Sequence, residues 1–295
     1  MKKLITLAQI SCDAQGFQNH IERIKSIIAE YRSSDLIVFP ELILHGHPSR
    51  ERPEGFLYRR LEGRERRLSE DMAAYVRELD ARIIIGEIRR RGDMFYNLAT
   101  YMDYATVQSY AKVHVHWTEQ FVPGRDFPVL STPAGRLGMT VCFDSAFCEI
   151  GRVLALRGAQ IIVNIAAVPK SFPVKYMRRR LAALALNNQL FVVYVNRPGP
   201  FFSGASAVFD PHGDILAHAG EGEDVLHVEI DLEVMRSWRE EEDIYGRRRP
   251  LLYREIGAEK QKRQGGRKKW EAKKEISSYL PPPPGAARQA GGTHG

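Results

Sequence analysis

Several features that would quickly assign a sequence to a class are missing from this one. It has only three cysteines in 295 residues, too few for a disulfide framework at this size. No apolar run reaches the roughly 18 residues that a membrane-spanning helix needs. The Gly-x-Ser-x-Gly turn of serine hydrolases is also absent. We therefore expect a cytoplasmic protein of a reducing compartment, with no membrane span and no serine nucleophile of that type.

The first twelve residues contain a short apolar run that only faintly imitates a signal peptide. Thr6 and Gln9 interrupt this run, and no small-residue cleavage site follows it. The segment from Leu4 to Ile10 is therefore predicted to be the first strand of the fold.

The net charge of +7 is concentrated at one end of the chain. Residues 257–295 hold nine Lys or Arg and three Glu, a net charge of +6, so the rest of the chain is near +1. The same segment is rich in Gly and Pro, and its proline run at 281–284 excludes helix. We predict one domain over residues 1–256 and a disordered basic tail over residues 257–295. A near-neutral domain of this kind is not expected to bind nucleic acid.

Short apolar segments alternate with amphipathic ones along residues 1–256, which is typical of a layered α/β fold. Apolar strands of this kind are buried on both faces by helices. Further strands near residues 95–110 and 206–230 are expected to pair antiparallel, so the sheets should be mixed. The predicted strands lie at 36–39, 83–85, 161–163 and 191–195, and the predicted helices at 17–31, 68–79, 150–156 and 174–188.

Three chemically complementary residues stand at predicted strand ends. Glu41 follows an apolar strand and Pro40, which cannot donate a ladder hydrogen bond. Lys112 follows a second predicted strand. Cys142 follows a third, in which the apolar residues Leu137, Met139 and Val141 alternate with small or polar ones. Strand ends that line up at one edge of a sheet bring such residues together although they are far apart in sequence.

The three side chains have the chemistry that a thiol hydrolase needs. A thiol requires a base or a neighbouring cation to become the attacking thiolate. A carboxylate in a pocket serves as that base, and an ammonium stabilises the oxyanion that forms on attack. Taken singly, each residue also has a structural interpretation: a surface carboxylate for Glu41, a solvated lysine for Lys112 and a packed core thiol for Cys142.

The segments around these residues resemble the three motifs of the carbon–nitrogen hydrolase family, also called the nitrilase superfamily, in the family's order and spacing. Further matches extend the resemblance over residues 4–253. The matching residues are Phe39-Pro40-Glu41 with Gly46, Tyr110-Ala111-Lys112 with Val113-His114, and Gly138-x-x-Val141-Cys142-Phe143-Asp144 with Phe147 and Glu149.

This resemblance implies a four-layer αββα sandwich that forms homodimers or larger homo-oligomers, and an enzyme that needs no cofactor or metal. It implies that Cys142 is the nucleophile, Glu41 the general base and Lys112 the oxyanion stabiliser. The backbone N–H of Phe143 would be a second oxyanion donor, and Glu119 would orient the lysine or the substrate. The reaction would pass through a thioester acyl-enzyme and release ammonia or an amine from a small molecule.

The details of the motifs favour an amidase over a nitrilase. The Phe-Asp pair after Cys142 is more similar to amidases and carbamoylases, whereas the spacing from Lys112 to Glu119 is more similar to nitrilases. Ser145 and Ala146 stand where many carbamoylases have two arginines that bind a carboxylate. We therefore predict hydrolysis of a linear amide, or of an N-carbamoyl compound, with nitrile hydrolysis as the alternative.

Two interpretations from other classes remain open. The pairs His45-x-His47 and His114-x-His116 would each place two imidazoles on one strand face if extended, which suits zinc, although a cysteine mechanism needs no metal. The expected role of these histidines is to line a polar pocket. Alternatively, the chain is a non-catalytic binding or assembly protein whose basic tail contacts phosphates or whose proline run docks in an aromatic groove.

Overall fold

The computed structural model describes residues 1–12, 17–46 and 64–258. Residues 1–247 form one compact unit, and residues 248–295 form a second. The described part of the second unit contains two short helices, η2 (Pro250–Tyr253) and α7 (Arg254–Gly257). The predicted domain boundary at residue 256 stays a prediction, because almost all of the predicted tail lies outside the described residues.

Two mixed six-stranded sheets make up the centre of the first unit. The first sheet has the order β12-β1-β2-β3-β4-β5 and the second β11-β10-β9-β8-β7-β6. The first sheet consists of β1 (Lys2–Gln9), β2 (Leu36–Val38), β3 (Ile83–Arg91), β4 (Met94–Met102), β5 (Val107–Ala111) and β12 (Asp224–Asp231). The second consists of β6 (Val129–Thr132), β7 (Gly135–Val141), β8 (Ile161–Ala166), β9 (Phe191–Asn196), β10 (Ala207–Phe209) and β11 (Ile215–His218).

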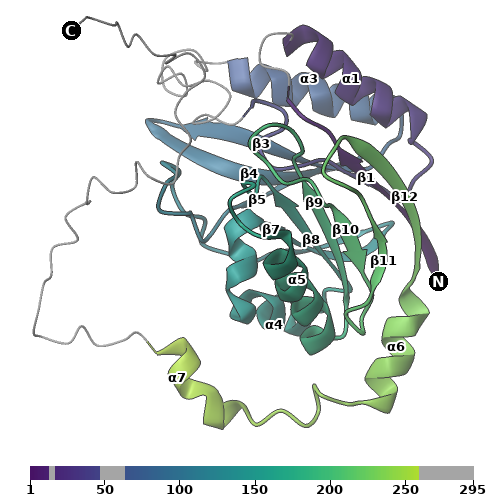
Figure 1. Cartoon of the computed structure of the whole chain (residues 1–295), viewed down its shortest axis with the longest axis vertical. Coiled ribbons are helices and arrows are strands. Elements are labelled where there is room, and N and C mark those ends of the chain that lie inside the picture. The colour runs from purple at the N-terminus through teal and green to yellow at the C-terminus, as the bar shows by residue number, and fades with distance from the viewer. Residues whose placement is uncertain (13–16, 47–63, 259–295) are drawn as a thin grey trace, which may run out of the picture. The chain divides into compact units, whose positions relative to one another are not determined.

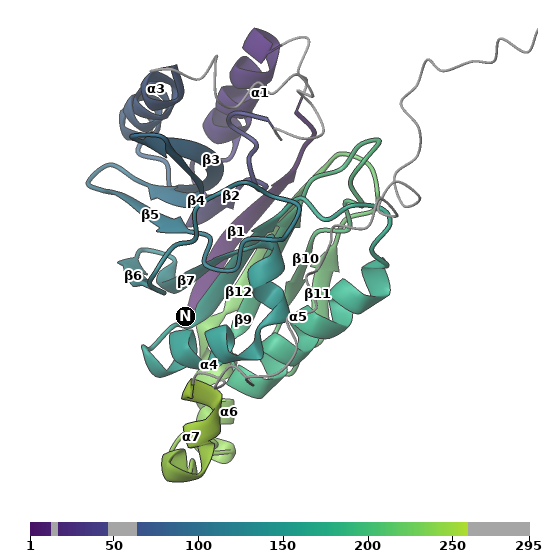
Figure 2. The ribbon, with the colours of Figure 1, turned by 90° about the vertical axis from the view of Figure 1, so that its left-hand side faces the viewer.

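Helices cover the outer face of each sheet, as Figures 1 and 2 show. On the first sheet they are α1 (Phe17–Glu30) and α3 (Arg64–Glu78), and on the second α4 (Cys148–Leu156) and α5 (Val174–Asn188). The helix α6 (Leu232–Glu241) follows β12. None of the helices in the described ranges combines the length and apolarity that crossing a bilayer requires.

Three apolar clusters correspond to the three interfaces between these four layers. Ile84 and Tyr101 of the first sheet share one cluster with Val163 and Val193 of the second, so the sheets pack face to face. A second cluster joins α1 and α3 to the first sheet, and a third joins α4 and α5 to the second. Each fully buried aliphatic side chain contributes roughly 1.5–3 kcal/mol. The predicted αββα sandwich is thus confirmed.

Most predicted elements are confirmed with small changes at their ends. The helix predicted over 174–188 coincides with α5, and the antiparallel pair predicted near 95–110 is β4 with β5. The helix predicted to begin at residue 68 begins at Arg64 instead. The polar residues of its first turn made the sequence there resemble a loop, because they carry no apolar stripe.

Candidate active site

A close crossing of two backbone segments positions Glu41. β2 ends at Val38, and Glu41 passes directly over Gly86 of β3. A Cβ atom on Gly86 would lie only 2.3 Å from the carbonyl oxygen of Pro40 and 2.6 Å from the Cα of Glu41. A glycine is therefore required at residue 86 for the Glu41 backbone to reach its position. The Glu41 side chain is 1% exposed.

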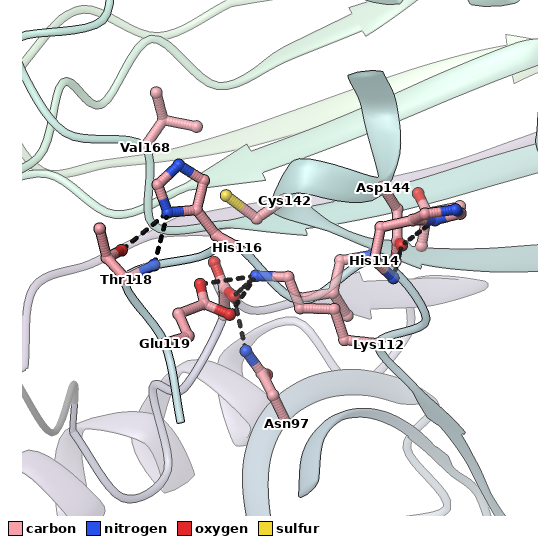
Figure 3. Close-up of polar contacts among 12 residues, drawn as sticks. Asn97, Lys112, His114, His116, Thr118, Glu119, Cys142, Asp144 and Val168 are labelled. Atoms are coloured by element: carbon pink, nitrogen blue, oxygen red, sulfur yellow. Dashed lines mark hydrogen bonds and ion pairs between the residues drawn. The ribbon is translucent and has the colours of Figure 1, made fainter. Parts of the chain in front are cut away.

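Lys112 lies between two carboxylates (Figure 3). Its backbone N–H continues the β4–β5 ladder by donating to the carbonyl of Asn97 over 2.9 Å. Its Nζ is 3.0 Å from Oε1 of Glu41 and 2.8 and 2.9 Å from the two carboxylate oxygens of Glu119. Nδ2 of Asn97 donates to the same Glu41 oxygen over 2.7 Å. These partners compensate the cost of burying the lysine and both acids.

Cys142 lies in a strained turn at the end of β7. Its φ angle is +47°, in the left-handed region that side chains other than glycine seldom adopt. The 3₁₀ helix η1 (Cys142–Ala146) begins at this residue, and the Ser145 hydroxyl donates to the Cys142 carbonyl over 2.8 Å. Strained backbone of this kind persists where the surroundings hold it firmly, and it is concentrated at functional sites. Cys142 as a whole residue is half-buried.

Asp144 holds this turn against the first sheet. The fully buried carboxylate accepts hydrogen bonds from the backbone N–H of Val141 over 2.9 Å and from the Tyr110 hydroxyl over 2.7 Å. The backbone N–H of His114 donates to its other oxygen over 2.8 Å. One side chain thus connects the strand before Cys142 to the segment around Lys112. No role was predicted for Asp144 from the sequence, although it stands within the third motif.

The electrostatics of the site couple the sulfur to the three charged groups. Burial raises the pKa of the Cys142 thiol well above its usual value, and Glu41 raises it further, whereas Lys112 lowers it. Burial alone would lower the pKa of Lys112, but attraction to Glu41, Cys142 and Glu119 outweighs burial and raises it. Burial, followed by repulsion from Glu41, raises the pKa of Glu119 to about 6. The thiol therefore needs a base before it can attack.

The structure thus brings together the residues that the sequence singled out from distant segments. Glu41, Lys112 and Glu119 are joined by direct hydrogen bonds, and Cys142 interacts electrostatically with all three. The first sheet supplies Glu41 and Lys112, and the second sheet supplies Cys142. The contact of Asn97 with Glu41 was not predicted from the sequence. A polar residue within an otherwise mostly buried strand was the signal that could have indicated it.

The histidine pairs do not form the strand faces that a metal site would have required. Residues 41–45 form turns, residues 113–114 form a bend and residues 117–118 form a turn, so the described parts of these two segments are not strands. Nδ1 of His45 accepts from the backbone of Ile88 over 3.0 Å, and His114 binds Asp144 instead. Within the described ranges, no group of three or more potential ligands could hold a metal ion. His47 lies outside the described residues.

His116 is close enough to the site to interact electrostatically with Lys112 and Glu41. Its Nδ1 is 2.7 Å from the Thr118 hydroxyl, and its ring packs edge to face on Phe143 with centroids 5.0 Å apart. Burial, followed by the charge of Lys112, lowers the pKa of His116. The imidazole is therefore neutral at pH 7 and contributes a polar edge beside the residue that follows Cys142.

Comparisons with known proteins agree with this geometry. The family model described as carbon-nitrogen hydrolase matches residues 4–240. A nitrilase of Pyrococcus abyssi is 31% identical over 238 residues, covering 76% of this chain and 88% of that protein. An (R)-stereoselective amidase of a Pseudomonas species is 31% identical over 228 residues, covering 74% and 81%. A solved carbon-nitrogen hydrolase from Helicobacter pylori G27 has a TM-score of 0.78 at 21% identity, covering 88% of this chain and 99% of that one.

The chain therefore belongs to the carbon–nitrogen hydrolase family, within the nitrilase superfamily, and is a hydrolase of that class. The resemblance inferred from the three motifs is confirmed.

Proposed function

We propose that the protein is an amidase that cleaves the C–N bond of a small linear amide through a thioester on Cys142. The position of Lys112 carries this proposal: its Nζ is 3.0 Å from Glu41 and 2.8 Å from Glu119. The charged side chains are thereby fixed before a substrate arrives, which is how an enzyme lowers the cost of reorganisation. The similarity to the Pseudomonas amidase supports the same reaction.

In the first half of the reaction, Glu41 accepts the thiol proton as the Cys142 sulfur attacks the amide carbonyl. Proton transfer must accompany attack because the pKa of the thiol is raised, so little thiolate exists beforehand. Lys112 and the backbone N–H of Phe143 stabilise the oxyanion. Glu41 then gives its proton to the leaving nitrogen, the C–N bond breaks, and ammonia or an amine departs from a thioester.

In the second half, water hydrolyses the thioester. Glu41 takes a proton from the water as its oxygen attacks the thioester carbonyl, and the same oxyanion donors stabilise the intermediate. The C–S bond breaks, the sulfur recovers the proton from Glu41, and a carboxylic acid leaves. Glu119 keeps the lysine oriented by its two-point contact throughout both halves. Because Glu41 alternates between base and acid, no cofactor enters this scheme.

A nitrilase reaction is the second candidate. The 31% identical Pyrococcus protein is called a nitrilase, and the direct contact between Lys112 and Glu119 gives a role to the spacing that resembles nitrilases. The same sulfur would attack a nitrile carbon, and two waters would be consumed to give the acid and ammonia. A non-catalytic binding or assembly protein would not need the thiol.

The deciding experiment is a screen for ammonia release from linear amides, N-carbamoyl compounds and nitriles, with Cys142→Ala measured alongside. We expect release from linear amides by the unmodified protein only. A labelled substrate should shift the mass of the peptide that contains Cys142. A label on Cys148 would contradict the proposal, and ammonia from nitriles but not amides would favour the nitrilase. Turnover that survives Cys142→Ala would overturn both.

The proposal extends to assembly and location. We propose a homodimer or larger homo-oligomer in the cytoplasm. Apolar side chains on the outer helices support assembly: Leu156 of α4 and Tyr176 and Leu186 of α5 are 44–48% exposed. Analytical ultracentrifugation of the full chain should show a species larger than the monomer; a monomer at micromolar concentration would contradict this part.

A further inference from the structure

The structure contains a cavity of about 500 Å³ whose lining includes none of the proposed active-site residues. It lies on the outer face of the first sheet, with Arg89 and Arg91 of β3 beside Tyr96 of β4. The side chains on its β5 side, Ser109 and Ala111, are small, so the sheet surface is hollow there. Cavities of this size hold small organic ligands.

The helices that cover the first sheet end before they reach this cavity. The cluster that joins α1 and α3 to the sheet extends to Ile85 on β3 and Met102 on β4, and none of its residues lines the cavity. The strands β3 and β4 continue from there to their hairpin at Arg91 and Met94 (Figure 2). Within the described residues, no helix covers this part of the sheet face, and three arginines lie beside it.

The wall opposite β3 is held firmly in place. Residues 122–125 form it, and the Gly124 N–H donates to the carbonyl of Lys112 over 2.8 Å, while the Val122 N–H donates to that of Phe95 over 2.8 Å. A Cβ atom on Gly124 would lie 2.1 Å from the carbonyl oxygen of Ala111. The segment therefore packs directly on β5, and the cavity is preformed.

Within the described residues, one of the three arginines has a carboxylate partner. Arg89 forms an ion pair with Glu87, which is fully buried and also accepts a hydrogen bond from Thr100 over 2.7 Å. This pair fixes the position of Arg89 at the cavity and neutralises its charge. The net charge of the lining then depends on Arg91 and Arg125.

Arg91 and Arg125 have no ion pair within the described part of the chain. The acid nearest in sequence to Arg91 is Asp93, which pairs with Arg90 over 3.2 Å. Arg91 instead lies over the ring of Tyr96, 5.7 Å from its centroid. These contacts leave its guanidinium charge uncompensated at the cavity.

Arg125 is in the same situation on the opposite wall. Its neighbour Asp126 pairs with Arg157 over 2.7 Å, and the hydrogen bonds to Arg157 and to the Phe127 N–H lower the pKa of Asp126, so its charge is engaged elsewhere. Two uncompensated guanidinium groups thus face one preformed cavity. Guanidinium groups bind phosphate oxygens with paired, charge-assisted hydrogen bonds.

We propose that this cavity binds a small organic phosphate ester. The two uncompensated charges match a phosphate dianion, which Arg91 and Arg125 would hold from opposite walls. The organic part would lie against Tyr96, Leu98 and Pro123, which also line the cavity. The cavity has room for more than the phosphate group, so an ester fits it better than inorganic phosphate.

Isothermal titration calorimetry on the full chain tests this proposal with phenyl phosphate, inorganic phosphate and benzoate as probes. Phenyl phosphate should bind saturably with a dissociation constant of about 1 mM or tighter, and more tightly than the other two probes. Arg91→Gln and Arg125→Gln should each weaken binding by about tenfold. Unchanged melting temperatures will show that both variants are folded.

Arg236→Gln is the matched control, because Arg236 is an exposed arginine of α6 whose loss changes the net charge equally. Its affinity for phenyl phosphate should equal that of the unmodified chain. Absence of saturable binding, equal binding of phenyl phosphate and inorganic phosphate, or an equal loss in Arg236→Gln would each overturn the proposal. The measurement needs no turnover, so its outcome is independent of the proposed amidase reaction.

Discussion

The proposed active site and the arginine cavity (Arg89, Arg91 and Arg125) differ in whether their cations have carboxylate partners. In the site, the Lys112 side chain is fully buried and meets two carboxylates within 3.0 Å. In the cavity, Arg91 and Arg125 are exposed, and the acids beside them are paired with other arginines. The two carboxylates hold the Lys112 charge in place for the reaction, whereas the charges of Arg91 and Arg125 remain available to bind an anion. We therefore expect hydrolysis at the first region and anion binding at the second, within one domain.

The largest expected effect concerns the sulfur, which only the site possesses. Cys142→Ala should lower amide hydrolysis by at least about 10³-fold, because no other group can form the thioester. Phenyl phosphate binding at the cavity should be unchanged. The measurement is kcat/KM with a linear amide, and Cys148→Ala serves as the control with near-normal activity. A comparable loss of activity in Cys148→Ala would contradict the assignment of Cys142 as the nucleophile.

The difference between Lys112, which has two carboxylate partners, and Arg125, which has none within the described residues, can be tested by measuring the stability of variants. Lys112→Met leaves Glu41 and Glu119 buried without their cation, which should lower the free energy of unfolding by about 3–5 kcal/mol at pH 8. Arg125→Met removes no ion pair and should change it by no more than about 0.5 kcal/mol. Urea denaturation of both variants makes the comparison. Equal losses would show that the two cations do not differ in the way proposed.

The backbone crossing at Gly86 gives a more selective test of the site. Gly86→Ala places a Cβ atom 2.3 Å from the Pro40 carbonyl and so must displace Glu41. A displacement of about 1 Å is expected to cost on the order of 10²-fold in kcat. Gly222→Ala is the control, since nothing lies within 4 Å of its Cβ position. Full activity in Gly86→Ala would mean that Glu41 need not occupy its present position.

The rate of amide hydrolysis at the proposed active site should depend on pH through Glu119. The pKa of Glu119 is raised to about 6, by burial first and then by Glu41. Below pH 6 its protonation removes a carboxylate from Lys112, so kcat/KM should fall as pH falls, by up to tenfold per unit. Glu119→Gln should be less active at pH 8 and should lack this acid limb. An acid limb at the same pH in that variant would assign it to another group.

The smallest effect is expected from the basic tail. Deletion of residues 257–295 should leave both amide hydrolysis and phenyl phosphate binding unchanged, because all the residues proposed to act in the two regions lie before residue 257. The two assays on the shortened chain measure this directly. Loss of phenyl phosphate binding in the shortened chain would indicate that the Lys and Arg residues of the tail bind the anion. It would favour the alternative of a binding protein.

How much the sequence could reveal depended on the range of the interactions. The apolar run at Leu36–Val38 and the helical period of α5 are local, and both elements were predicted within a residue or two. The start of α3 was misplaced because its first turn is polar and has no apolar stripe to mark it as helix. The pairing of the histidines on one face required a strand, and neither His45 nor His114 lies in one.

The sequence by itself determined the family and the alternation of strands and helices, and it predicted the acid, the amine and the thiol of the proposed site, because each depends on residue types at short spacing. Only the tertiary structure decided which groups support them. Asn97, Gly86 and Asp144 act across sheet neighbours and layer contacts that no local pattern encodes. The uncompensated charge of Arg91 and Arg125 likewise emerged only in three dimensions, because it depends on which acids the folded chain pairs with other arginines.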